Sequence, residues 1–166
     1  MFIYPTDTIY GIGCNALNSA AVQKIRKIKH RPTNPFSIWA PNKEWIHNNC
    51  DTSSVLANNY IPKLPGPYTI ILPIKKDCQL PEVIYPGKNS LGVRIPNHYL
   101  TEFFQELDIP IITTSVNKSG QRFMTSLETL DQDIQKQVSF IIYDGEIKNK
   151  PSKIINCITA QEIERE

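Results

Sequence analysis

Short apolar runs, separated by proline, glycine and asparagine, are the feature that most restricts how this chain can fold. Runs rich in Ile, Val, Phe and Tyr occur at residues 2–4, 36–39, 69–74, 91–95, 110–114, 139–143 and 153–157. They have the length of strands rather than of buried helices. Between them, residues 18–29 place Val22, Ile25 and Ile28 on one helical face, and residues 99–107 repeat this spacing. The alternation predicts an α/β fold with a twisted, largely covered sheet.

The length of 166 residues is enough for one domain with a substantial core and too short for two. The apolar fraction of 40% and charged fraction of 20% are typical of a soluble globular protein. No stretch approaches the roughly 18 to 20 apolar residues that span a bilayer. Pro5 and Asp7 interrupt the start of the chain, which therefore does not resemble a secretory signal. We expect a cytoplasmic protein without membrane partners.

Net charge and cysteine spacing argue against a general electrostatic attraction for nucleic acid and against a cysteine–histidine metal site. A formal charge of +2 is nearly neutral, so any attraction for nucleic acid must come from a local patch. The four cysteines are widely spaced, with no C-x-x-C pair and no histidine at finger spacing. We therefore expect reduced, packed thiols and no protein-bound metal.

The string from Gly11 to Ala16 fits G-x-G-x-x-A, the dinucleotide fingerprint. That fingerprint needs glycines directly after a strand and an acidic residue about 20 positions later. Here residues 5–10 intervene, and the region 33–36 contains no Asp or Glu. A Rossmann site is therefore excluded, and the absence of G-x-x-x-x-G-K-[ST] excludes a P-loop.

A basic stretch, KIRKIKHRP, closes the first predicted helix at Pro32. Cations in a last helical turn offset the helix dipole by a few tenths to about 1 kcal/mol, so a solvated basic turn is a sufficient explanation for the stretch alone. However, Lys29 and Arg31 leave the helix beside a loop that carries Asn34. The alternative is therefore a compact anion clamp.

Two further polar positions have a structural and a functional interpretation. Ser115, in TTSVNKSG, lacks the G-x-S-x-G elbow and a histidine placed to activate it, so this turn supplies hydrogen-bond donors or is ordinary turn chemistry. Arg94 lies inside an apolar run and must find a carboxylate, a phosphate or solvent. A structural ion pair and a ligand contact are equally compatible with it. Asp7 and His98 receive no role.

Six segments occur in one order along the chain: YPTDTIYGIG, KHRPTNPF, PGPYTIIL, LGVRIPNH, TTSVNKSG and KPSKII. In this order they resemble the YrdC-like family of threonylcarbamoyl-AMP synthases over nearly the whole length. The resemblance implies one YrdC-like domain over residues 1–166, N-terminally short relative to the family, with a twisted open mixed sheet flanked by helices. It also implies an enzyme that forms threonylcarbamoyl-AMP and pyrophosphate from L-threonine, bicarbonate and ATP with Mg²⁺. The product would serve threonylcarbamoyl modification of adenosine 37 in tRNA, with tRNA or a threonylcarbamoyl-transferase complex as the downstream partner.

The same resemblance implies a role for particular residues. The family's Lys-x-Arg pair corresponds to Lys29 and Arg31, which would be catalytic, and its Ser-x-Asn pair corresponds to Ser115 and Asn117. Relatives of this fold without synthase activity tend to lack both pairs. ATP would contact Arg31, Asn34, Ser90, Ser115, Asn117 and Arg165. Threonine would contact Thr8, Arg94, Thr113 and Ser152, with YPTDTIYG as a wall of its pocket.

The implied reaction needs no protein nucleophile. Threonine's amine and bicarbonate give a carbamate whose oxygen can attack the α-phosphate, so the protein mainly positions and neutralises anions. Lys29, Arg31 and Arg94, with Mg²⁺ on the phosphates, suit that task. Two alternatives remain: a carbamoyl-adenylate transferase domain like those of hydrogenase maturation, which are parts of much longer chains, and a non-catalytic RNA-binding protein of the same fold.

Overall fold

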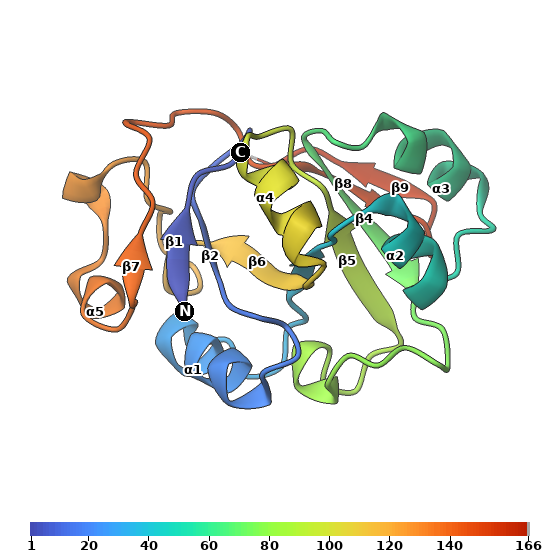
Figure 1. Ribbon diagram of the computed structural model, residues 1–166, viewed down its shortest axis with the longest axis horizontal. Coiled ribbons are helices and arrows are strands. Elements are labelled where there is room, and N and C mark those ends of the chain that lie inside the picture. The colour runs from blue at the N-terminus through green and yellow to red at the C-terminus, as the bar shows by residue number, and fades with distance from the viewer. Residues whose placement is uncertain (166) are drawn as a thin grey trace.

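A mixed β-sheet crosses the whole molecule in the computed structural model, which describes residues 1–165 (Figure 1). Within these residues the nine strands follow the order β7-β1-β2-β6-β3-β5-β4-β8-β9. Three pairs are parallel (β1 with β7, β3 with β5, β4 with β8), and the other five pairs are antiparallel. The strands are β1 (Phe2–Tyr4), β2 (Gly11–Gly13), β3 (Ser37–Trp39), β4 (Tyr68–Pro73), β5 (Ser90–Arg94), β6 (Ile111–Ser115), β7 (Phe140–Ile141), β8 (Lys153–Asn156) and β9 (Gln161–Ile163).

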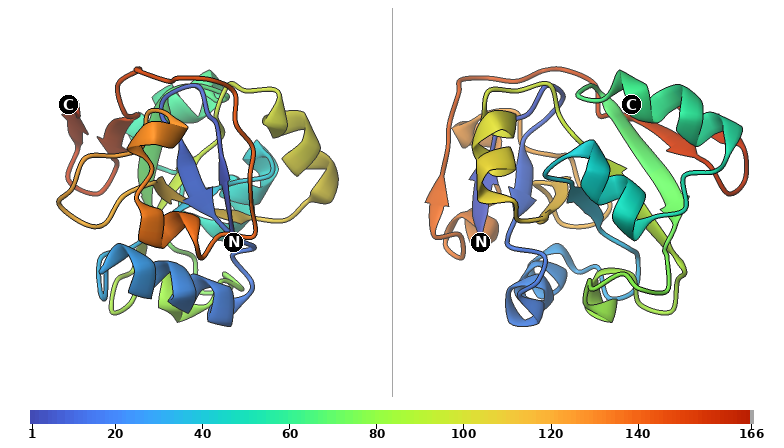
Figure 2. Two further views of the ribbon diagram at one scale, coloured as in Figure 1. Left: turned by 90° about the vertical axis from the view of Figure 1, so that its left-hand side faces the viewer. Right: turned by 45° about the vertical axis from the view of Figure 1, so that its right-hand side comes forward.

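Helices cover both faces of this sheet (Figures 1 and 2). They are α1 (Ser19–Lys29), α2 (Lys43–Asn49), α3 (Val55–Tyr60), α4 (Leu100–Leu107) and α5 (Gln132–Gln135), with 3-10 turns η1 (Ile61–Lys63), η2 (Glu82–Ile84) and η3 (Leu127–Thr129). The largest core joins α1, α2 and α3 to Ile38, Val93 and Ile112 of the sheet. A smaller aromatic core lies under α4 and includes Trp39 and Ile111. Because neighbouring strand residues point to opposite faces, these two cores lie on opposite sides of the sheet.

The predicted α/β class is confirmed, and every predicted apolar run overlaps a strand. Both predicted helices are present as α1 and α4. The apolar pattern of the sequence did not predict β2, β9, α2, α3 or α5. No helix within residues 1–165 is both long and apolar enough to cross a bilayer.

The G-x-G string forms strand β2, which pairs antiparallel with β1 and β6. A Cβ added to Gly11 would lie 2.7 Å from the ring of Tyr4, and one added to Gly13 would lie 2.0 Å from the carbonyl oxygen of Ile112. These contacts leave no room for side chains. The glycines therefore allow neighbouring groups to approach the backbone.

Helix α1 places the loop that follows it. Its N-cap Asn18 accepts a hydrogen bond from the backbone of Ala21 at 3.0 Å, and its C-cap His30 adopts a left-handed conformation with φ of 49°. The left-handed residue ends the helix and turns the chain. Residues 31–36 then lead directly into β3.

Candidate functional site

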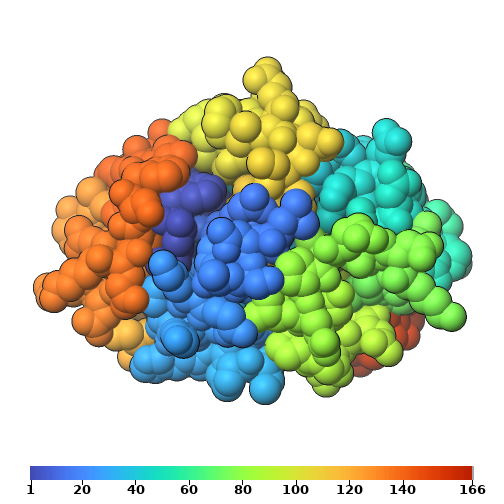
Figure 3. Space-filling model, turned by 60° about the horizontal axis from the view of Figure 1, so that its bottom comes forward, coloured from blue at the N-terminus to red at the C-terminus, as the bar shows by residue number. Residues whose placement is uncertain are grey.

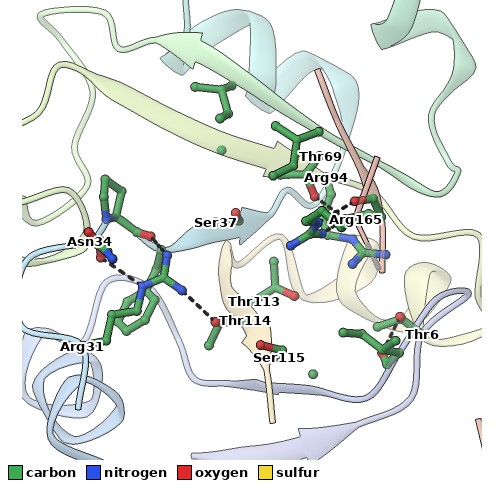
Figure 4. A pocket seen from close by; sticks show the side chains of 18 of the residues that line it. Thr6, Arg31, Asn34, Ser37, Thr69, Arg94, Thr113, Thr114, Ser115 and Arg165 are labelled. Atoms are coloured by element: carbon green, nitrogen blue, oxygen red, sulfur yellow. Dashed lines mark hydrogen bonds between the residues drawn. The ribbon is translucent and has the colours of Figure 1, made fainter. Parts of the chain in front are cut away.

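A pocket of about 320 Å³ lies where the loop after β1, the loop after α1, strands β3 to β6 and the start of β8 meet. Most of the predicted site residues line it: Arg31, Asn34, Ser90, Arg94, Thr113, Ser115, Ser152 and Arg165. Figure 4 shows two ends, with Arg31 and Asn34 at one, Arg94 and Arg165 at the other, and Thr113, Thr114 and Ser115 of β6 between them. Segments far apart in the sequence therefore form one cavity whose wall carries many polar side chains.

The Arg31 end comprises Arg31, Asn34, Pro35 and Phe36, with Thr114 facing them. Arg31 donates from Nε to the carbonyl oxygen of Asn34 at 3.3 Å, from Nη2 to that of Pro35, and from Nη1 to Oγ1 of Thr114 at 3.5 Å. Its guanidinium carbon is also 5.2 Å from the ring centroid of Phe36. All these partners are neutral, and burial lowers the pKa of Arg31. The positive charge at this end is therefore held in place without being neutralised.

Lys29 and Asn117 lie behind the wall of the pocket. Lys29 is 1% exposed, and its Nζ donates to the carbonyl oxygens of Ser115 and Asn117, the latter at 2.7 Å, and to Oδ1 of Asn117 at 3.0 Å. Ser115 Oγ donates to the same Oδ1 at 2.6 Å. Burial, and secondarily Arg31, lower the pKa of Lys29 to about 7. The ammonium therefore holds together the turn that carries Ser115.

The Arg94 end comprises Arg94, Thr69, Ser152 and Arg165, with Asp7 and Thr8 behind Arg94. Arg94 Nη2 donates to Oδ1 of Asp7 at 2.8 Å and to Oγ1 of Thr8 at 3.1 Å. Oδ2 of Asp7 accepts from the backbone of Asn97 at 2.9 Å. Arg94 is thus both ion-paired and part of the pocket wall, so the two interpretations of this residue are compatible. Thr8 is buried behind the arginine rather than lining the cavity.

Ser152 and Arg165 close the Arg94 end. Ser152 Oγ shares a hydrogen bond of 2.7 Å with Oγ1 of Thr69. Arg165 donates from Nε to the carbonyl oxygen of Ser152 at 2.8 Å and from Nη2 to its hydroxyl. Burial lowers the pKa of Arg165, and so do the charges of Arg94 and Arg31. Arg165, predicted for ATP, therefore lies among residues predicted for threonine.

Several lining residues were not predicted from the sequence. Ser37 pairs in register with Gly92 on one side and Thr113 on the other, and a Cβ on Gly92 would lie 2.6 Å from Oγ of Ser37. Gly92 thus leaves space for the Ser37 side chain beside the pocket. Thr69 reaches the site by the pairing of β4 with β8. Only the alternation of side chains along each predicted strand could have indicated these positions.

The site is suited to anion binding rather than to nucleophilic or metal chemistry of its own. No Asp or Glu is among the residues that line the pocket within the described part of the chain. In residues 1–165 no group of three or more His, Cys, Asp or Glu could hold a metal ion. The hydroxyl of Ser115 faces an amide oxygen rather than a histidine. What the pocket offers is three arginines and many hydroxyls.

The family model described as "Telomere recombination", whose name joins Sua5, YciO and YrdC, matches residues 1–166. This chain belongs to the Sua5/YciO/YrdC family. A relative from Methanocaldococcus jannaschii, provisionally named threonylcarbamoyl-AMP synthase, is 42% identical over 154 residues, which cover 90% of this chain and 70% of the relative. The threonylcarbamoyl-AMP synthase of Bacillus subtilis is 32% identical over 145 residues, 86% of this chain and 42% of that protein.

Solved structures of the Sua5/YciO/YrdC family superpose on nearly the whole chain. Sua5 of Pyrococcus abyssi complexed with L-threonine matches with a TM-score of 0.84 and 31% identity over 97% of this chain. YciO of E. coli also matches with a TM-score of 0.84, at 25% identity over 99% of this chain and 82% of its own. The chain spans less than half of the Bacillus synthase and 48% of the Pyrococcus Sua5 chain. It therefore corresponds to one part of those longer proteins.

Proposed function

We propose that this chain forms threonylcarbamoyl-AMP and pyrophosphate from L-threonine, bicarbonate and ATP, for threonylcarbamoyl modification of adenosine 37 in tRNA. Support comes from relatives named threonylcarbamoyl-AMP synthase and from a threonine complex of a structural neighbour. The observation that carries the proposal is one pocket with Arg31 at one end, Arg94 and Arg165 at the other, and the hydroxyl side chains of β6 between them (Figure 4).

The two ends differ in charge in a way that fits two different substrates. Arg31 has only neutral partners, and Lys29 lies behind it, so this end suits a multiply charged triphosphate. Arg94 is paired with Asp7, and Arg165 beside it adds one positive charge with neutral partners, so the net charge of this end suits a singly charged carboxylate. Ser152 and Thr113 add hydroxyls beside it. We assign the nucleotide to the Arg31 end and threonine to the Arg94 end.

The reaction balances without a covalent protein intermediate. The amine of threonine attacks the carbon of bicarbonate, and loss of water leaves a carbamate. A carbamate oxygen then attacks the α-phosphorus, and the bond to the β-phosphate breaks to release pyrophosphate. Fixed positive charge stabilises the negative charge that develops on the phosphates, and alignment replaces a bimolecular encounter.

Magnesium enters this proposal as part of the substrate MgATP. The pocket lining has hydroxyls, amides and arginines but no carboxylate among the described residues, so the chain offers no evident ligand set of its own. The ion would remain on the phosphates. tRNA or a threonylcarbamoyl-transferase complex would receive the product, in the cytoplasm.

A coupled pyrophosphate assay with each component omitted in turn tests the proposal. Release should require threonine, bicarbonate, ATP and Mg²⁺ together, and serine should be used less well because a pocket that packs the γ-methyl loses about 1 to 3 kcal/mol without it. No release with all components present, or release of inorganic phosphate instead, would contradict the proposal. The alternative of a non-catalytic RNA-binding protein predicts RNA binding without pyrophosphate release.

A further inference from the structure

Arg26, in the middle of α1, is a buried cation that the proposed site does not contact. The side chain is 4% exposed, and its charge is opposed by burial and by Arg31 rather than balanced by a carboxylate. Its Nε donates to the carbonyl oxygen of Val83 at 2.7 Å, and its Nη2 donates to that of Ile84 at 3.0 Å. These carbonyls belong to η2, which lies beside α1 in Figure 1, and the same two regions adjoin on the surface in Figure 3.

The same guanidinium also binds the loop that follows α1. Its Nη1 donates to the carbonyl oxygens of Arg31 at 2.8 Å, Asn34 at 3.1 Å and Pro32 at 3.3 Å. A buried charge is tolerated only where its donors are satisfied, and here every partner is a backbone carbonyl. One side chain therefore joins α1, η2 and residues 31–34.

Two of these carbonyls are shared with groups of the Arg31 end. The oxygen of Asn34 accepts from Nη1 of Arg26 and from Nε of Arg31, and the oxygen of Ile84 accepts from Nη2 of Arg26 and from the backbone of Phe36. Both guanidinium groups also contact the ring of Phe36, with carbons 4.5 Å and 5.2 Å from its centroid. Arg26 thus fixes the acceptor and the ring against which Arg31 is held.

We propose that Arg26 is a positioning residue for ATP: it acts through the Asn34 carbonyl and Phe36 to aim Arg31 into the pocket. The inference rests on the function proposed above for its effect on catalysis. Arg26 touches no substrate itself, since it is absent from the pocket lining. The Arg94 end shares none of its contacts, so the effect is specific to the nucleotide.

Arg26→Lys is the informative variant because it keeps the positive charge but loses the planar guanidinium group with its several N–H donors. A lysine ammonium is a single point of donation and cannot reach carbonyls on η2 and on the loop together. We expect the KM for ATP to rise about tenfold with the KM for threonine unchanged, since a displaced positioning group costs one to two orders of magnitude. Lys27→Met, an exposed neighbour on α1, is the matched control and should change neither.

A double-mutant cycle separates this role from a general loss of structure. If Arg26 acts through Arg31, ATP affinity measured by titration calorimetry should fall in Arg26→Lys and in Arg31→Met. In the double variant it should fall no more than about twofold below Arg31→Met alone. The proposal would be overturned if the losses of ATP affinity in the two single variants multiplied in full in the double variant. It would also be overturned if Arg26→Lys raised the KM values for ATP and threonine equally.

A measurement made without nucleotide tests the role of Arg26 separately from the proposed function. Amide hydrogen exchange over residues 31–36 should be faster in Arg26→Lys than in the wild type, with exchange in β5 and β6 unchanged. Should the wild type fail to bind ATP, the proposed function falls, while this exchange pattern still supports or refutes the tie between Arg26 and the loop. Unchanged exchange over residues 31–36 would refute it.

Discussion

The two ends of the pocket hold their arginines by different means. Arg94 lies on strand β5 and forms an ion pair with Asp7, whose second oxygen is bound by the backbone of Asn97. Arg31 lies on a loop and binds two carbonyls, a threonine hydroxyl and an aromatic ring. A strand arginine with a carboxylate is fixed and partly neutralised, whereas a loop arginine with neutral partners keeps its full charge and depends on the loop for its position.

This difference fits the proposed binding of two anions of unequal charge in one cavity. An arginine with only dipoles around it gains most from a polyphosphate, and one already paired gains less. It also indicates how each arginine loses its position: Arg94 depends chiefly on its ion pair with Asp7, and Arg31 depends on several weak contacts made by residues 31–36 and Thr114.

Removal of Arg31 should have the largest effect. Arg31→Ala should cost at least about 2 to 3 kcal/mol of transition-state stabilisation, as loss of a preorganised charged contact does. The measurement is kcat/KM for ATP in the pyrophosphate assay, with the exposed Arg122→Ala as a control for loss of one positive charge. Wild-type turnover in Arg31→Ala would show that the uncompensated charge at this end is not used.

Neutralisation of Asp7 should make the two ends more alike. Asp7→Asn keeps an acceptor for Arg94 but leaves a buried cation unpaired, so the free energy of unfolding should fall by about 2 kcal/mol, within the range of a lost charged hydrogen bond. The KM for threonine should rise because Arg94 loses its support, and the KM for ATP should change little. Urea unfolding measures the change in the free energy of unfolding, and the KM values for threonine and ATP measure the effect on each end of the pocket. An equal rise in both KM values would contradict the division of the pocket.

Lys29 should give the Arg31 end a pH dependence. Its pKa in the folded chain is about 7, below its ordinary 10.5, so the unfolded chain binds more protons between these values. The free energy of unfolding should therefore rise with pH across that window, by up to about 1.4 kcal/mol per pH unit for one proton. Below the window, Lys29 should contribute no dependence on pH.

Subtraction of the curve for Lys29→Met isolates this slope, because the other titrating groups are common to both chains. The measurement is urea unfolding from about pH 6 to about pH 10. Arg31→Met should raise the pKa of Lys29 in the folded chain, since Arg31 lowers it, and so narrow the window from its lower end. A constant difference between wild type and Lys29→Met at every pH would show that the amine is not perturbed.

The sequence predicted the elements whose side chains are buried in a regular pattern. Helix α1 shows Val22, Ile25 and Ile28 on one face, and all three are buried. Helix α2 buries only Ile46, helix α3 only Ala57, and strand β9 is exposed throughout, so none of these carries a periodic apolar signal. Glycine-rich β2 was missed for the opposite reason: its fit depends on groups from β1 and β6.

The site was predictable as a set of residues but not as an arrangement. Most of the residues that the family resemblance named line one pocket, but their roles stay predictions. It did not indicate that Asp7 would pair with Arg94, 87 positions away, or that Arg26 would bind five carbonyls. Those partners are brought together by sheet order and by loop geometry, which local patterns do not encode.

Ser115 should give the smallest effect, because it lies between the two ends and adds one neutral hydrogen bond. Its hydroxyl donates to Oδ1 of Asn117, the atom that also accepts from Lys29, so Ser115→Ala removes one of two donors from that oxygen. ATP binding should weaken by about 0.5 to 1.5 kcal/mol, the usual value of one hydrogen bond. Threonine binding should be unchanged, which titration calorimetry with each substrate can check. Because the carbamate oxygen is the nucleophile in the proposed reaction, mass spectrometry during turnover should find no acyl or phosphoryl adduct on Ser115. A trapped adduct would mean that the serine attacks substrate and that the pocket does more than hold two anions at its ends.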